Sequence, residues 1–187
     1  MPNQSDPRYV QSEHAICDAL ARLLEHKALS SITMSELARE AGVSRGTLYA
    51  HFNNVCEAYE RAVVLFYKRT QTLDEHFSCA TCRESRTTRA YCECLRDAGS
   101  YASVVADERF LPTTMHVYDP KGLHMLKEKL QAAGMPEQLA HAICLFQMSG
   151  CYSVATSTAA SDEEWRQCQE ALDRFIQGGL SALGVEL

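Results

Sequence analysis

The 187-residue sequence predicts an all-α protein, and three observations support that prediction. Glycine and proline are few, with nine and five residues, so little of the chain is interrupted by turn formers. Apolar residues recur at the spacing of amphipathic helices, and strand-like alternation is hard to find. No apolar run approaches the roughly 20 residues of a membrane helix, and the first residues do not resemble a signal peptide. We therefore expect a cytoplasmic protein with no membrane partner.

The first helix is expected to begin at Pro7. Asp6 is a good N-cap, and proline is favoured at the first helical position. One apolar stripe should then pack beneath the helices that follow; it consists of Ala15, Ile16, Ala19, Leu20, Leu23 and Leu24.

Residues 33–52 predict two short helices around a tight turn. Thr33 can cap the first of them, and Glu36 completes a capping box. Gly42 stands where the chain must turn through a left-handed conformation, and Ser44 is a good N-cap for the second helix. This is the layout of a helix-turn-helix, whose second helix enters the major groove of DNA.

The second helix of this pair separates apolar from polar residues. Leu48 and Phe52 should point back to the core. The side expected to face outward carries Arg45, Gly46, Thr47, Tyr49 and His51.

The same segment resembles the DNA-binding headpiece of the TetR family of transcriptional regulators. The resemblance rests on Thr33, on Ala41-Gly42-Val43-Ser44, and on Gly46-Thr47-Leu48-Tyr49-Ala50-His51-Phe52. It covers roughly residues 10–68. It implies a headpiece over residues 1–52 and a helical effector-binding and dimerisation domain over residues 53–187, with a fourth helix, about 53–70, linking the two.

This resemblance implies a ligand-responsive repressor that binds a palindromic DNA operator as a homodimer. Arg45 and Thr47 are the candidates for base edges, because arginine favours guanine and the threonine methyl can touch thymine. Tyr49 and His51 should bind phosphates, although His51 alone could be a solvated surface histidine. The predicted DNA-binding set is Thr33, Ser44, Arg45, Gly46, Thr47, Tyr49, His51 and Asn53.

Two features weaken the expected affinity for DNA. The net charge is −6, and residues 1–52 carry five Lys/Arg against six Asp/Glu. The family usually has a lysine three residues after the His-Phe pair, where this chain has Val55. We therefore expect weak nonspecific binding, and a partner-binding module that has lost DNA binding is one alternative.

Helical patterns resume after a polar stretch over residues 77–87. They run through Tyr91 to Ala98, near Tyr101 to Val105, from Asp119-Pro120 to about Ala133, and from Pro136 to about Thr158. Ser161 and Glu164 form a second capping box at the start of the final helix. That helix carries one apolar stripe, namely Trp165, Cys168, Leu172, Phe175, Ile176, Leu180 and Leu183.

In the resembling family the last two helices form a four-helix dimer interface. Small residues that permit close approach fit this role here, namely Ser149, Gly150, Ser153 and Ala155. The alternative is that both helices belong to an intramolecular core. A dimer is also needed physically, because two recognition helices spaced by about 34 Å read successive major grooves of a palindrome.

A small-molecule effector is expected among the C-terminal helices, where methionine and aromatic side chains can line an adaptable pocket. The same residues also fill ordinary cores. The candidates are Phe110, Met115, His116, Tyr118, Met125, Phe146, Met148, Cys151 and Tyr152.

Four cysteines offer a further alternative, a metal- or thiol-responsive regulator. Cys79, Cys82, Cys92 and Cys94 lie within sixteen residues, with His76 nearby. Incidental thiols are the favoured interpretation, because the second pair does not have the usual zinc-finger spacing. We expect no metal, no cofactor and no enzymatic activity, since no phosphate-binding loop, nucleophile elbow or zinc-protease motif occurs.

Overall fold

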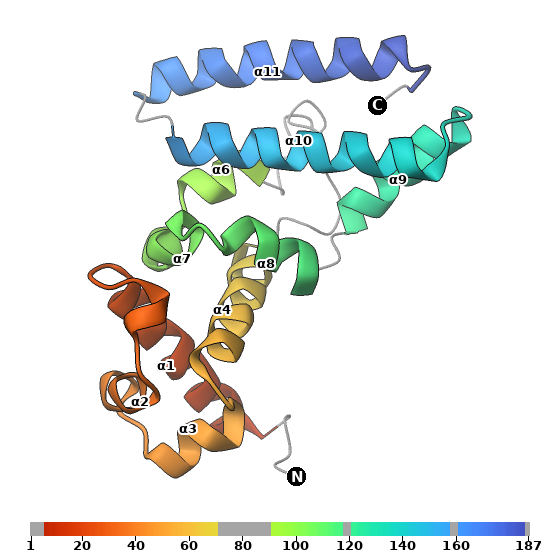
Figure 1. Cartoon of the computed structure of the whole chain (residues 1–187). Coiled ribbons are helices and arrows are strands. Elements are labelled where there is room, and N and C mark those ends of the chain that lie inside the picture. The colour runs from red at the N-terminus through yellow and green to blue at the C-terminus, as the bar shows by residue number, and fades with distance from the viewer. Residues whose placement is uncertain (1–5, 71–90, 118–120, 158–160, 186–187) are drawn as a thin grey trace. The chain divides into compact units, whose positions relative to one another are not determined.

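The structure is a computed structural model that describes residues 6–70, 91–117, 121–157 and 161–185. These residues form helices and connecting turns, and none of them lies in a strand (Figure 1). The all-α prediction is confirmed. No helix among the described residues is both long enough and apolar enough to span a membrane.

The chain folds as two compact units, each built from two stretches of sequence. The first unit comprises residues 1–69 and 98–118, and the second comprises residues 70–97 and 119–187. The first contains α1 (Pro7–Leu24), η1 (Leu29–Ser31), α2 (Met34–Ala41), α3 (Arg45–His51), α4 (Val55–Thr70), η2 (Gly99–Tyr101), α7 (Ala102–Ala106) and α8 (Phe110–Val117). The second contains α6 (Tyr91–Arg96), α9 (Lys121–Ala132), α10 (Glu137–Ser157) and α11 (Asp162–Ala182). The functional boundary after residue 52 stays a prediction.

Predicted caps begin the helices of both units. The Asp6 carboxylate accepts a hydrogen bond from the Arg8 N–H at 2.8 Å, with Pro7 at the start of α1. Complete capping boxes join Thr33 to Glu36 on α2 and join Ser161 to Glu164 on α11. Each satisfies backbone donors that the helix leaves unpaired.

The core of the first unit lies beneath α1. Ile16, Ala19 and Leu20 of the predicted stripe are buried, whereas Leu23 and Leu24 are partly exposed. Leucines and aromatic residues of the later helices complete this core; they include Leu37, Leu48, Phe52, Val63, Phe66 and Phe110.

Polar side chains tie η2 and α7 to the first helices. The Tyr101 hydroxyl donates to Asp18 at 2.9 Å, and Arg69 donates to both oxygens of the same carboxylate. The Ser103 hydroxyl donates to the Ala21 carbonyl at 2.6 Å. Residues 98–118 therefore belong to the body that carries the predicted headpiece.

The sequence pattern did not predict α8. Proline normally ends a helix because it lacks an N–H donor, and Pro112 is the third residue of this one. Within the first turn that N–H has no intrahelical acceptor, so the proline is tolerated there. Phe110 and Thr114 anchor α8 in the core.

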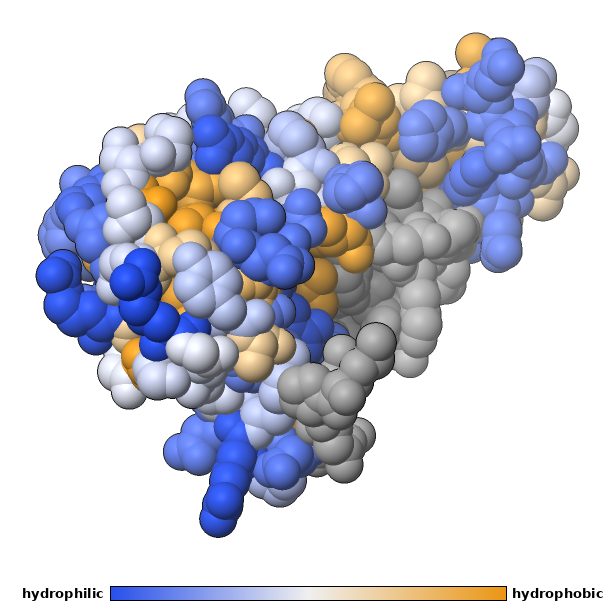
Figure 2. Space-filling model, turned by 60° about the horizontal axis from the view of Figure 1, so that its bottom comes forward, coloured by the Kyte–Doolittle hydropathy of each residue, from blue (hydrophilic) through white to orange (hydrophobic). Residues whose placement is uncertain are grey.

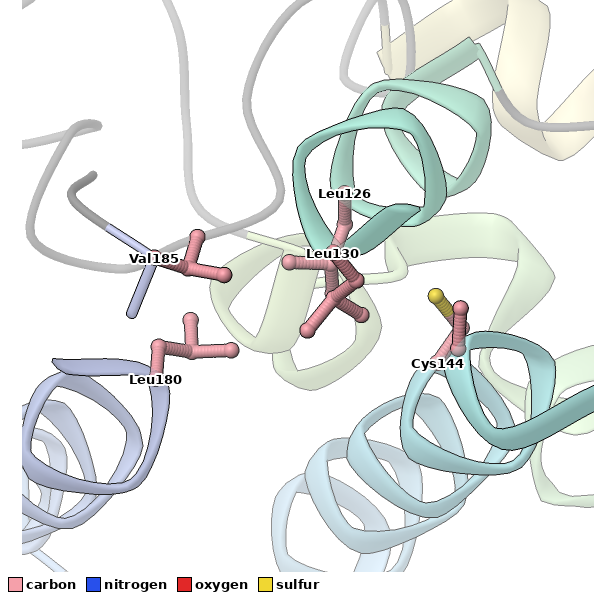
Figure 3. Close-up of a cluster of buried hydrophobic side chains, with 6 residues drawn as sticks. Leu126, Leu130, Cys144, Leu180 and Val185 are labelled. Atoms are coloured by element: carbon pink, nitrogen blue, oxygen red, sulfur yellow. The ribbon is translucent and has the colours of Figure 1, made fainter. Parts of the chain in front are cut away.

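The core of the second unit is a cluster of small and medium apolar side chains between α9, α10 and α11 (Figure 3). Leu130 of α9 is fully buried and lies near Cys144 of α10 and Leu180 of α11. Val185, just beyond α11, closes the cluster. Gly134 and Gly184 adopt left-handed conformations just after α9 and α11, which is a common way for a helix to end.

The predicted apolar stripe of α11 is only partly buried. Trp165 and Leu180 are buried as expected, but the Phe175 side chain is 67% exposed. Gln169 and Asp173 are buried instead. In the isolated chain, this helix therefore turns polar residues inward and a large aromatic ring outward.

Candidate DNA-binding surface

The turn between α2 and α3 depends on one glycine. Gly42 has a φ of 67°, a left-handed conformation that only glycine adopts without steric cost. Its N–H donates to the carbonyls of Ala38 and Arg39, and the Val43 N–H donates to Ala38 at 3.0 Å. These bonds satisfy the last carbonyls of α2 and set the direction in which α3 begins.

The recognition helix is held from beneath and capped at its start. The Ser44 hydroxyl accepts the Thr47 N–H at 3.0 Å. Leu48 is fully buried, and Phe52, directly after the helix, is 6% exposed. Both predictions for these side chains are confirmed.

The opposite side of α3 is open to solvent. Arg45 and Gly46 are exposed, the Tyr49 side chain is 51% exposed, and Thr47 is half-buried. The Arg45 guanidinium donates to the Ser35 hydroxyl at 2.7 Å, and the Thr47 hydroxyl shares a hydrogen bond with Ser44 at 2.8 Å. Such exposed bonds can be exchanged for bonds to DNA at little cost.

His51 does not lie on that open side. Its Nε2 atom is 2.7 Å from the Ser12 hydroxyl, and its ring centroid is 3.9 Å from that of Tyr9. Both partners belong to α1. The predicted outward orientation of His51 is wrong, because the ring is drawn toward an aromatic and a hydroxyl partner that lie far away in the sequence.

The start of α4 is occupied by a carboxylate. Asn54 caps the helix by accepting the Glu57 N–H at 3.0 Å. The Glu57 carboxylate accepts bonds from the Asn53 N–H at 2.9 Å and from the Asn53 side-chain amide, and these bonds lower its pKa. Val55 is half-buried here and provides no cation. The Asn53 amide would have to exchange a bond to Glu57 for one to DNA.

Ion pairs remove much of the acidity of the headpiece. Four of the six acidic residues in residues 1–52 pair with a cation, and the pairs are Glu13–Arg61, Asp18–Arg69, Glu36–Lys27 and Glu40–Arg22. Within the described part of the chain, the side chains of Arg8, Arg39 and Arg45 have no carboxylate partner. The unpaired charge available to phosphates is thus more positive than the composition indicates.

Figure 2 shows the side of the molecule on which α3 lies. On this side, hydrophilic side chains surround smaller apolar areas. This mixture suits nucleic acid, because phosphates need polar donors and thymine methyl groups need apolar contact.

The predicted effector residues are divided between the two units. In the first unit Phe110 is fully buried against Phe66 and Tyr67, Met115 is half-buried and His116 is exposed. In the second unit Met148 is fully buried, Cys151 and Tyr152 are half-buried, and Phe146 is 68% exposed. Tyr118 and the side chain of Met125 lie outside the described residues. Of these residues, Phe146 and Cys151 line a common groove, which lies between α10 and α11.

An apolar groove of about 280 Å³ lies between α10 and α11. Two phenylalanines and two glycines are prominent in its lining, together with branched side chains; they include Phe146, Gly150, Val154, Phe175, Gly179 and Leu183. A Cβ added at either glycine would meet no atom within 4 Å. The predicted small-residue set contributes Gly150 to this groove, whereas Ala155 is buried.

Only two of the four clustered cysteines lie among the described residues. Cys79, Cys82 and His76 lie outside the described residues. Cys92 and Cys94 are buried on α6, where the Gln169 amide donates to the Cys92 sulfur at 3.6 Å. Among the residues that the structure describes, no group of three or more His, Cys, Asp or Glu side chains could hold a metal ion.

The capped turn, the buried underside of α3 and its open polar side define a helix-turn-helix DNA-binding unit. Residues 16–54 match the family model described as bacterial regulatory proteins, tetR family. The match confirms the resemblance of this segment to the DNA-binding headpiece of the TetR family of transcriptional regulators.

The crystal structure of the TetR family repressor AlkX from Dietzia sp. strain DQ12-45-1b, implicated in biodegradation of n-alkanes, is 17% identical to this chain. It aligns with a TM-score of 0.44 and covers 94% of this chain and 98% of its own. No curated protein matches the sequence.

Proposed function

We propose that the protein is a ligand-responsive repressor that binds a palindromic operator as a homodimer. It acts by binding and not by catalysis, in the cytoplasm where the operator is accessible. The observation that carries the proposal is the open polar side of α3, which carries Arg45, Thr47 and Tyr49. The opposite side of the helix is buried and holds it in place.

Sequence reading would come from the start of α3. Arg45 is exposed, and its guanidinium donates to the neutral Ser35 hydroxyl, so it can exchange that bond for two bonds to the O6 and N7 atoms of guanine. Thr47 lies two residues further along the helix and offers a methyl group to thymine. Tyr49 would supply a phosphate contact that fixes the register, and so would Thr33, Ser44, Gly46 and Asn53.

Dimerisation would use the open faces of α10 and α11. Phe146 and Phe175 are more than half exposed, and the groove between the two helices is lined almost entirely by apolar residues. Monomeric proteins rarely leave contiguous apolar surface of this kind uncovered. A second copy would cover it and would place two recognition helices on one operator.

Ligand control would act through the C-terminal helices. A small, largely apolar molecule bound there can change operator affinity only by its different affinity for two arrangements of the headpieces. Titration of the protein with candidate ligands, followed by both thermal stability and operator affinity, tests this ligand control. A ligand that raises the melting temperature and leaves operator affinity unchanged would contradict the inducer role.

The DNA-binding proposal is tested by selection from random duplexes with the purified protein. We expect one enriched sequence, and we expect Arg45→Ala to weaken binding to it by about 1–3 kcal/mol while relaxing preference at one base position. Lys129→Ala is the matched control, because it removes one positive charge from an exposed position of α9, outside the headpiece. Failure to enrich any sequence would overturn the repressor proposal and would favour a partner-binding module.

A further inference from the structure

We propose that His51 is a positioning residue, which docks the C-terminal end of the recognition helix on α1 as the neutral tautomer protonated at Nε2. This inference rests on the proposed DNA binding for its functional consequence. The docking itself is a property of the protein without DNA.

The contact joins two helices that are distant in sequence. His51 is the last residue of α3, and Ser12, 39 residues earlier, lies on α1. The two side chains meet at 2.7 Å, while the Tyr9 ring lies against the imidazole with an interplanar angle of 39°. The end of α3 is therefore fixed laterally by a hydrogen bond and a ring contact, in addition to Leu48 beneath it.

The hydrogen-bond partners of Ser12 determine the tautomer. The Ser12 Oγ atom lies 2.9 Å from the Tyr9 carbonyl oxygen and 3.0 Å from the Arg8 carbonyl oxygen. Carbonyls only accept hydrogen bonds, and a serine hydroxyl has one proton to donate. We assign that proton to a carbonyl of α1, and with this assignment His51 donates from Nε2 in the bond at 2.7 Å.

The second ring nitrogen explains why the neutral form is required. Nδ1 of His51 is buried and has no hydrogen-bond partner among the described residues. Protonation would place a charged N–H in this position without an acceptor. Burial lowers the pKa of His51, against a smaller opposing effect of the Glu13 carboxylate of α1. Glu13 is in turn paired with Arg61 of α4 at 2.6 Å, which offsets its charge.

Docking and direct phosphate contact predict opposite responses to acid. If His51 bound phosphate, its protonation would add a positive charge at the DNA and would tighten binding as pH falls. If His51 docks α3 in its neutral form, protonation breaks the fit to α1 and weakens binding.

The first experiment needs no DNA. Long-range ¹H–¹⁵N spectra of the full chain distinguish the two neutral imidazole tautomers from imidazolium, and the His51 signals are those lost in His51→Phe. At pH 7.5 we expect the tautomer protonated at Nε2, and we expect Ser12→Ala to shift the His51 signals. A ring protonated at Nδ1, or an imidazolium at this pH, would overturn the proposal.

The second experiment is a double-mutant cycle on the operator recovered by selection. Ser12→Ala removes the acceptor, and His51→Phe keeps a ring against Tyr9 while removing the donor. Each should weaken operator binding by about three- to tenfold, the loss expected for one hydrogen bond. The double variant should bind no more weakly than the weaker single variant, with an unchanged dependence on salt. Effects that multiply would overturn the docking role.

Two controls make the cycle specific. Tyr49→Phe lies on the open side of α3, so its effect should multiply with that of Ser12→Ala. His51→Gln retains an N–H donor near the Nε2 position and cannot titrate, so it should restore affinity relative to His51→Phe and abolish the weakening by acid. Tighter wild-type binding at pH 5.5 than at pH 7.5 would instead identify His51 as a phosphate contact. A protein that selects no operator would remove the proposed function, while the tautomer spectra would still decide the docking.

Discussion

The recognition helix α3 and the terminal helix α11 distribute their residues in opposite ways. On α3 the apolar Leu48 is fully buried, and Arg45 and Tyr49 are exposed. On α11 the polar Gln169 and Asp173 are buried, and Phe175 is 67% exposed. Both helices have a side-chain N-cap, so the difference does not arise from their ends.

This contrast indicates which part of the molecule is complete in a single chain. The underside of α3 is satisfied by its own unit, and its polar side is free for a ligand with polar and charged groups. The outer face of α11 leaves aromatic surface in water, which costs free energy in proportion to its area. We infer that α10 and α11 form the region that a second copy completes.

Reversing the character of the α11 face should have the largest effect. Phe175→Glu places a charge in the proposed interface, and we expect the dimer dissociation constant to rise at least about 30-fold, as for loss of a central anchor. Sedimentation velocity over a concentration series measures it. Gln177→Glu is the matched control, because it adds the same charge at an exposed polar position of the same helix. Equal dissociation constants for Phe175→Glu and the wild type would contradict the proposed interface.

Truncating one leucine in each region compares a closed core with an open face. Leu48→Ala should destabilise the protein by about 2–5 kcal/mol, because a fully buried side chain is replaced by a cavity. Leu139→Ala, at a side chain that is 57% exposed on α10, should change stability by no more than about 0.5 kcal/mol. Urea unfolding followed by circular dichroism measures both. Both substitutions are made in the Phe175→Glu background at low protein concentration, so that a second copy does not cover Leu139. A comparable loss in the two variants there would mean that α10 is already covered in the single chain.

One substitution should have opposite signs at two glycines. Gly42→Ala should cost about 1–2 kcal/mol, because φ is 67° and the strain arises even though the site has room for a Cβ. Gly178→Ala, within α11 and equally unobstructed, should stabilise by about 0.4–1 kcal/mol through the unfolded state. Thermal unfolding gives both values. Destabilisation at Gly178 would show that a neighbouring chain approaches this helix closely.

The capping box of α2 should be sensitive to acid. The hydrogen bond from Lys27, with those from Thr33, lowers the pKa of Glu36 from 4.5 to about 2. A lowered folded-state pKa gives stability that is present above about pH 4.5 and is lost as pH falls toward 2. The wild type should therefore lose its advantage over Glu36→Gln across that interval in pH-dependent thermal unfolding. A constant difference between the two proteins would contradict the Lys27–Glu36 pairing.

The smallest expected effect is that of a restored cation at α4. Val55→Lys should tighten specific and nonspecific binding together and should steepen the salt dependence by about one phosphate per headpiece. The neighbouring Glu57 carboxylate will offset part of the gain. Binding isotherms at salt concentrations from roughly 50 to 200 mM measure this slope. An unchanged slope would mean that the start of α4 does not approach the DNA backbone.

Local signals made the headpiece predictable. A capping box, a left-handed glycine and a serine cap each act within about four residues, so Thr33, Gly42 and Ser44 could be assigned from spacing alone. The confirmed directions of Leu48 and Phe52 follow from helical periodicity. The second capping box, at Ser161 and Glu164, was predictable for the same reason.

The remaining features depend on partners that are far apart in the sequence. His51 turns inward because Ser12 and Tyr9 lie across from it on α1, and no local pattern encodes that contact. The burial of Gln169 reflects its bonds to Cys92 and Glu93 of α6. The effector residues could not be grouped for a similar reason, since methionines and aromatics have the same periodicity in a core as in a pocket.

The spacing of the DNA half-sites tests the central claim most directly, because it depends on α3 and on the α10–α11 pair together. Hydroxyl-radical footprinting on the selected operator should show an inverted repeat with two half-sites. Their centres should lie one helical turn of DNA apart, about 34 Å, or a multiple of that distance. Phe175→Glu at low concentration should protect one half-site alone. A single site without two-fold symmetry, protected equally by the wild type and by Phe175→Glu, would contradict a dimeric repressor.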